Sequence, residues 1–198
     1  MKKSIRYLSA ATLLLLSGML TGCARPGDDD ITRLLKQTYA CKNMEVIEIV
    51  KTDSLPGIYS YVAQYGFHLR FKDGEEGAKK FFQGLFAEQE VKGKDWEQWM
   101  RQEKVQEYLG NECSEAAEIM LERMTEFVLP QIADKNENVR IHILMPIAGW
   151  SEFMPGRKGW DITMRRDKVG GEPLMSEPIK RELLLPKQGD KSKKSDKK

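Results

Sequence analysis

Thiols are the side chains of this chain with the most distinctive chemistry, and the sequence holds three of them, Cys23, Cys41 and Cys113. No two of them form a C-x-x-C motif, which excludes the usual thiol–disulfide exchange site. The two histidines, His68 and His142, have no cysteine or carboxylate at the spacing of a zinc site. Nucleophile-elbow, H-E-x-x-H and P-loop patterns are also missing. The residue types therefore predict no catalytic residues, no metal ligands and no cofactor.

The segment before Cys23 has the parts of an export signal. Basic residues at the start of the chain precede an apolar stretch over residues 8–20. Small residues then lead to the cysteine, in the order Leu20-Thr21-Gly22-Cys23. A membrane-spanning helix needs about 20 apolar residues, and this run has about thirteen, interrupted by polar ones. The pattern indicates a secretory signal over residues 1–22 that is removed by cleavage.

With a cysteine directly after the small residues, the segment resembles the signal of bacterial lipoproteins. The resemblance covers residues 1–23 and implies cleavage between Gly22 and Cys23, a diacylglycerol on the Cys23 thiol and attachment to a membrane by acyl chains. In Gram-negative lipoproteins, aspartate after the lipidated cysteine favours retention in the inner membrane. Ala24 therefore implies the outer membrane, facing the periplasm. A plain secretory signal with an accidental cysteine remains the alternative.

If Cys23 carries lipid, Cys41 and Cys113 remain as one pair. Compartments outside the cytoplasm are oxidising, and two leftover cysteines there are more often bonded than free. We therefore expect a structural disulfide between them, which would close a long loop. Two buried free thiols are the alternative, because a free cysteine behaves as a small core residue.

Charge is distributed unevenly along the chain. The formal net charge is +2, but the export signal is basic and so is the lysine-rich end, residues 186–198. The sequence between them is acidic, which argues against a nucleic-acid-binding domain, because such domains present a basic patch. The lysine-rich end is predicted to be disordered. Residues 23–30 are then a tether, and residues 31–185 form a single domain.

Hydrophobic periodicity predicts the order α-β-β-α-α-α-β-β for this domain. A helix is expected to begin after the aspartates at 28–30, and alternating residues predict strands over 44–51 and 59–71. Apolar stripes at helical spacing follow over 78–86, 96–109 and 113–128, and alternation returns over 139–145 and 160–165. In the last of these segments, Ile162 and Met164 are expected on the apolar face and Arg165 on the polar face. Grouped strands and helices indicate an α+β fold: an antiparallel sheet of about four strands with helices packed on one face.

Residues 149–159 are expected to be a long hairpin loop between the last two strands. The segment contains glycines and a proline, and among them lie the apolar side chains of Trp150, Phe153 and Met154. Loops on a rigid scaffold often carry binding residues, so these three are candidates for contact with a partner. Alternatively, the loop folds back over an open end of the sheet.

These features predict a membrane-anchored envelope lipoprotein. Its domain is expected to be a binding or scaffold module for a periplasmic partner, either an envelope protein or the cell wall. Carboxylates are plentiful, so a carboxylate-dependent envelope hydrolase is the alternative; it requires two carboxyl groups in one concave pocket. An exposed apolar patch around Trp150 would favour the binding module instead.

Overall fold

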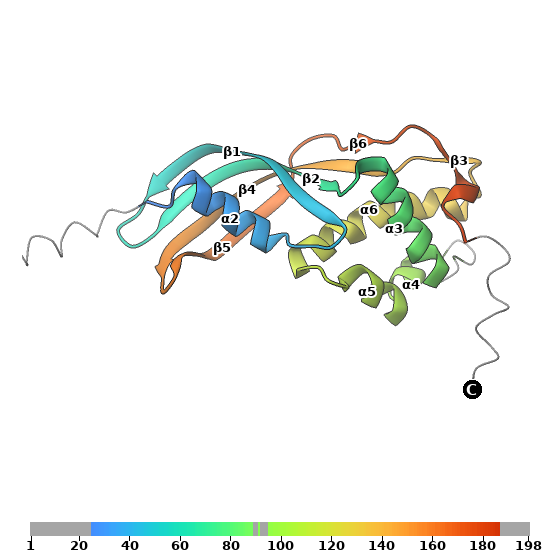
Figure 1. Ribbon diagram of the computed structural model, residues 1–198, viewed down its shortest axis with the longest axis horizontal. Coiled ribbons are helices and arrows are strands. Elements are labelled where there is room, and N and C mark those ends of the chain that lie inside the picture. The colour runs from blue at the N-terminus through green and yellow to red at the C-terminus, as the bar shows by residue number, and fades with distance from the viewer. Residues whose placement is uncertain (1–24, 89–90, 92–94, 187–198) are drawn as a thin grey trace, which may run out of the picture.

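The computed structural model describes residues 25–88, 91 and 95–186 (Figure 1). The expected export signal, the cleavage and acylation position at Gly22 and Cys23, and the tail from residue 187 onward lie outside these residues. Among the helices that are described, none combines the length and the apolar character needed to cross a bilayer.

An antiparallel sheet with strand order β1-β2-β4-β5 is the centre of the fold. Its strands are β1 (Met44–Pro56), β2 (Tyr61–Phe71), β4 (His142–Gly156) and β5 (Gly159–Val169). The short β6 (Leu174–Met175) also pairs with β4, and β3 (Asn138–Val139) pairs with β7 (Ile179–Lys180). The prediction of an α+β fold with a mainly antiparallel sheet is confirmed.

Five α-helices accompany the sheet in the described part of the chain. They are α2 (Asp28–Thr38), α3 (Gly74–Glu88), α4 (Trp96–Met100), α5 (Glu103–Gly110) and α6 (Glu115–Ala133), and a short 3-10 helix, η2 (Arg181–Leu183), follows β7. The single helix expected over 96–109 is instead divided into α4 and α5. The order of the main elements otherwise agrees with the sequence prediction.

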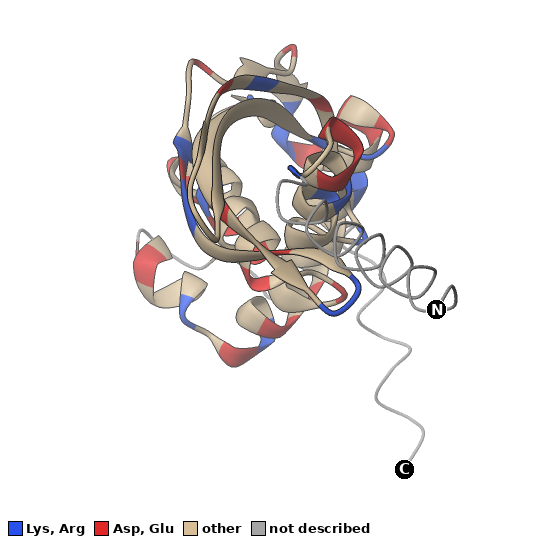
Figure 2. Cartoon of the chain, turned by 90° about the vertical axis from the view of Figure 1, so that its left-hand side faces the viewer, with Lys and Arg blue, Asp and Glu red and all other residues tan. Residues whose placement is uncertain are grey.

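The sheet is strongly curved, and Figure 2 shows its strands as an arc. Helix α2 contacts both edge strands, β1 and β5, and so bridges the two sides of the arc. At the other end of the strands, α3 packs on β2 and β4, and α4, α5 and α6 pack around it (Figure 1). We call the side of the sheet that α2 and α3 cover the inner face, and the opposite side the outer face.

Alternation along β2 places one row of side chains in the core, as predicted. Alternate residues from Tyr61 to Phe71 are buried, whereas those between them are partly or fully exposed. The Phe71 ring lies 5.4 Å from that of Phe81 on α3, and Phe67 lies 5.1 Å from Tyr39 at the end of α2. This aromatic row is therefore packed core rather than a ligand groove.

The boundaries expected at the first helix and the second strand are different in the structure. Helix α2 already begins at Asp28, with Gly27 as its N-cap, so only part of the segment 23–30 is available as a tether. The Asp30 carboxylate accepts the Gly27 N–H at 3.2 Å, which stabilises this early start. Tyr59, expected to begin the buried row, instead lies in the turn before β2 and is 81% exposed.

The prediction of a long loop over residues 149–159 is wrong. Strand β4 continues to Gly156 and β5 begins at Gly159, so the connection is the two-residue turn Arg157-Lys158. Glycine at position 149 does not mark a turn. A Cβ there would overlap the carboxylate of Asp167 on β5, so the small residue permits close packing between neighbouring strands.

Candidate functional site

The disulfide predicted between Cys41 and Cys113 is present in the structure. Cys41 follows α2, and Cys113 lies between α5 and α6. Around the bond, the Ser114 hydroxyl donates to the Thr38 carbonyl at 2.6 Å, and the Ser114 N–H donates to the Ala40 carbonyl at 2.7 Å. The cross-link therefore holds the end of α2 to the start of α6, which is a structural role.

The three residues proposed to contact a partner do not lie on one surface. Because they belong to strand β4, their side chains alternate between its two faces. Phe153 is completely buried on the inner face, where its ring lies 6.5 Å from that of Tyr61. Trp150 and Met154 lie on the outer face and are both accessible. Only these two can meet a partner without unfolding of the sheet.

Strand pairing surrounds Trp150 with residues of three other strands. It pairs with Gln64 on β2 and with Arg166 on β5, and paired residues share a face. The neighbouring row of the outer face is made by Leu55, Val62, Glu152 and Met164, in strand order. Trp150 is therefore part of a surface formed by all four long strands.

Apolar side chains gather on this part of the outer face. Leu55 is 70% exposed and Met164 is 56% exposed, although both are large and hydrophobic. We define the outer patch by its apolar members, which are Val50, Leu55, Val62, Trp150, Met154 and Met164. Exposed large side chains that gather on one sheet face, rather than singly, are typical of a surface that another molecule covers.

The sequence placed Met164 on the wrong face because strand β5 contains a bulge. Glu152 pairs with Met164, but the next residue, Phe153, pairs with Ile162, so Thr163 is an extra residue. A β-bulge shifts the alternation by one position. Met164, expected beside Ile162, therefore lies on the outer face. Arg165, expected on the polar side, lies on the inner face.

Beyond the bulge, the inner face contains a polar network that the sequence did not predict. Asp167 is almost completely buried, and its carboxylate accepts hydrogen bonds from the hydroxyls of Tyr39, at 2.6 Å, and Tyr65, at 2.8 Å. Arg165 Nε lies 3.2 Å from the same carboxylate. The Tyr65 hydroxyl also lies 2.8 Å from the Ser151 hydroxyl. These contacts join α2, β2, β4 and β5.

This inner network ties α2 to the strands of the sheet. Burial raises the pKa of both Tyr39 and Tyr65, and the adjacent Asp167 carboxylate raises it further. Both phenols therefore stay protonated and act as hydrogen-bond donors near neutral pH. Asp167 accepts from both phenols and is paired with Arg165, which gives the network a structural role.

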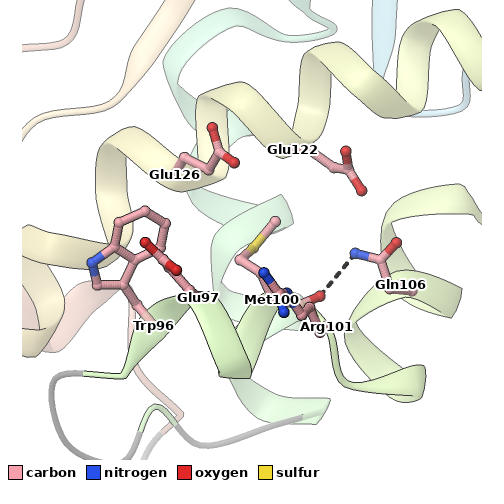
Figure 3. A pocket seen from close by; sticks show the side chains of 7 residues that line it. All are labelled: Trp96, Glu97, Met100, Arg101, Gln106, Glu122 and Glu126. Carbon is pink, nitrogen blue, oxygen red and sulfur yellow. Dashed lines mark hydrogen bonds between the residues drawn. The ribbon is translucent and has the colours of Figure 1, made fainter.

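An open groove of about 490 Å³ lies between α4, α5 and α6. Figure 3 shows Glu122 and Glu126 of α6 on the side of the groove opposite α4, which contributes Trp96 and Glu97. All three glutamates are at least partly exposed, whereas a general acid for glycoside cleavage needs a desolvated carboxyl group. The groove therefore does not support the hydrolase alternative. In the described part of the chain, no group of residues that could hold a metal ion is found.

Comparisons with known proteins add no functional assignment. The chain matches no protein-family model, no curated protein and no solved structure.

Proposed function

We propose that the protein is a lipid-anchored envelope lipoprotein whose domain binds a protein partner through the outer patch. The observation that carries the proposal is the exposed apolar surface around Trp150, on a sheet face that no described helix covers. Tryptophan, methionine and arginine are enriched at the centres of protein interfaces. Trp150 is next to Arg166 in the patch and close to Met164 in the neighbouring row.

The chemistry of the patch favours a protein over the cell wall as the partner. Cell-wall glycans and peptides are polar, and their recognition would need many convergent hydrogen-bonding groups. The outer patch instead offers aliphatic, thioether and indole surface across four strands. Removing such surface from water favours association, so an apolar protein surface is the matching occupant.

The disulfide supports the envelope as the compartment. A bond between Cys41 and Cys113 forms readily in an oxidising compartment and is rare in the cytosol. This agrees with an export signal over residues 1–22 and acylation of Cys23. Anchoring by more than one acyl chain is stable, because each buried CH₂ contributes about 0.8 kcal/mol.

Acylation is tested by a Cys23→Ser variant in cells fed radiolabelled palmitate. We expect loss of the label, accumulation of the unprocessed precursor, or both. Cys41→Ser is the matched control, because it removes a thiol without touching the proposed acylation position; it should keep the label but lose the mobility difference between reducing and non-reducing gels. Unchanged palmitate incorporation in the Cys23→Ser protein would contradict the proposed anchor.

Partner binding is tested with a photo-crosslinking amino acid at position 164 in living cells. A discrete protein adduct is expected, and Trp150→Ala in the same chain should abolish it, because the indole occupies the centre of the patch. The same crosslinker at Glu107, an exposed position on α5, is the control and should give no such adduct. An adduct that persists in the Trp150→Ala protein would contradict a role for the patch.

A further inference from the structure

The end of the sheet that lies beside the start of α2 combines exposed apolar and cationic turns. In the β1–β2 turn, the Gly57 N–H donates to the Ser60 carbonyl at 2.7 Å, and the residues at the tip point outward. Ile58 is 87% exposed and Tyr59 is nearly as exposed. The β4–β5 turn beside it carries Arg157 and Lys158, which are also exposed. Figure 1 shows both turns at the end of the molecule where α2 begins.

An ion pair holds the start of α2 at this end. Lys51 Nζ on β1 lies 2.9 Å from the Asp28 carboxylate, in the first turn of the helix. Helix α2 also contacts β5, the edge strand on the other side of the arc. The start of the helix is therefore held at this end of the sheet, and the chain preceding Gly27 leaves from it.

The distance to the proposed acylation position is short. Three residues lie between Cys23 and the N-cap Gly27, which makes four steps along the chain. An extended chain covers at most about 3.4 Å per step, or about 14 Å in all. Acyl chains on Cys23 would hold that residue at the surface of the bilayer. The start of α2 is thereby kept within this distance of the membrane, and the two turns lie at the same end of the domain (Figure 1).

We propose that the two turns form a membrane-contacting end, with Ile58 and Tyr59 entering the bilayer interface and Arg157 and Lys158 contacting lipid phosphates. This inference rests on the proposed acylation of Cys23. Tyrosine prefers the membrane–water interface, where its ring meets acyl chains and its hydroxyl meets headgroups. Arginine and lysine are attracted to anionic headgroups within a Debye length of the surface.

The acidic start of α2 belongs to the same end, and most of its charge has a cationic neighbour. Asp28 is paired with Lys51, and Asp30 is bound by the Gly27 N–H and by Arg33 at 3.4 Å. Asp29 is exposed in the same turn, and the exposed Arg25 just before the helix carries the opposite charge. The apolar tip therefore supplies the penetration, and the cationic turn sets the preference for anionic lipid.

A weak contact of this kind becomes effective because the anchor makes it intramolecular. Tethering raises the effective concentration of the turns at the bilayer, so a contact that would not hold a free domain can still orient a tethered one. The long axis of the domain runs from this end to the helices α3 to α6 (Figure 1). Membrane contact at the turns would thus hold these helices away from the bilayer and leave the outer patch accessible from the side.

The test uses the full acylated chain in vesicles of phosphatidylethanolamine and phosphatidylglycerol, with no other protein present. A polarity-sensitive fluorophore is attached to a cysteine introduced as Ile58→Cys. We expect blue-shifted emission that is quenched by lipids carrying a nitroxide. Glu107→Cys on α5 is the matched control, and its label should report water. A label at position 58 that reports water in acylated protein would overturn the inference.

The charge contribution is tested in the same vesicles with Arg157→Gln and Lys158→Gln. Each basic residue near an anionic surface changes membrane partitioning of the turns by about fivefold. The double variant should therefore lower the fraction of the position-58 label that lies in the bilayer of anionic vesicles. The same fraction should be unchanged in phosphatidylcholine vesicles. Equal bound fractions of the two proteins in anionic vesicles would remove the cationic turn from the proposal. Palmitate incorporation is scored on every sample, so a failure of acylation is distinguished from a failure of the turns to bind.

Discussion

The two faces of the sheet depart from the usual hydrophobic pattern in opposite directions. The inner face is apolar except for one buried network around Asp167, and the outer face is polar except for the exposed patch around Trp150. Both exceptions use residues that lie next to one another on β4 and β5. Their energetic consequences differ, because the buried phenols and the Asp167 carboxylate have hydrogen-bond partners within the chain, whereas the apolar side chains of the patch are exposed to water.

That difference separates a structural feature from a functional one. Each hydroxyl that surrounds Asp167 makes a hydrogen bond, so the cost of burying the carboxylate is offset and α2 is fixed to the strands. Leu55 and Met164 gain nothing in the free domain from their position on the outer face. Exposed side chains of this size are retained by a protein when another surface covers them. The inner exception therefore contributes to folding, and the outer one is the surface proposed to bind a partner.

The largest expected difference between the faces is at two consecutive residues of β4. Phe153→Ala removes a fully buried ring and should lower the free energy of unfolding by about 3–5 kcal/mol. Met154→Ala, on the outer face, should change it by less than about 1 kcal/mol. Urea denaturation followed by circular dichroism measures both. Similar losses for the two variants would contradict the assignment of their faces.

A smaller difference is expected where charges are concerned. Asp167→Asn keeps the side-chain shape but leaves Arg165 without its counter-charge. The two phenols donate to different oxygens of Asp167, and an asparagine NH₂ group in place of one oxygen cannot accept a hydrogen bond. We expect a loss of about 2–4 kcal/mol in unfolding free energy. Arg166→Gln, one residue earlier and on the outer face, should cost no more than about 0.5 kcal/mol. A neutral Asp167→Asn would show that the network does not stabilise the fold.

The inner tyrosines also predict how stability depends on pH. Their pKa in the folded protein is raised above the ordinary value of 10.0, so the stability they contribute is present below pH 10 and is lost as pH rises above it. Each contributes a loss of up to about 1.4 kcal/mol per pH unit in that range. Replacing Tyr65 by phenylalanine should flatten the alkaline decline in the urea midpoint. Tyr59→Phe, at an exposed turn, should leave the decline unchanged.

The fold was predictable wherever burial and chain periodicity agree. The alternation along β2 and the stripe along α6 are set by burial of one side of each element, so both were found from the sequence. The pair Cys41 and Cys113 was reached by a different route, through the assignment of Cys23 to lipid. That assignment is still a prediction, although the disulfide it led to is present.

The candidate site could not be predicted because it depends on register between strands. Gly149, Pro155 and Gly156 were interpreted as loop residues, since a single sequence does not show that a glycine lies under a neighbouring carboxylate. The bulge at Thr163 then reversed the faces of Met164 and Arg165. A one-residue shift exchanges the two faces of a strand, so the patch and the buried network were both hidden by the same local feature.

Two glycines on neighbouring strands are expected to give effects of opposite sign on the two faces. Gly66 on β2 belongs to the outer face, and a Cβ there would meet only the Ile147 carbonyl oxygen at 3.7 Å, an ordinary contact. Gly66→Ala should therefore raise the unfolding free energy by about 0.4–1 kcal/mol, because it restricts the unfolded chain. Gly149→Ala places the same methyl group against the Asp167 carboxylate on the inner face and should lower it by about 1–3 kcal/mol. Thermal denaturation measures both variants, and we expect their melting temperatures to shift in opposite directions, because only the inner-face position is closely packed. Shifts of the same sign would mean that Asp167 moves aside freely and that its hydrogen bonds do not fix α2.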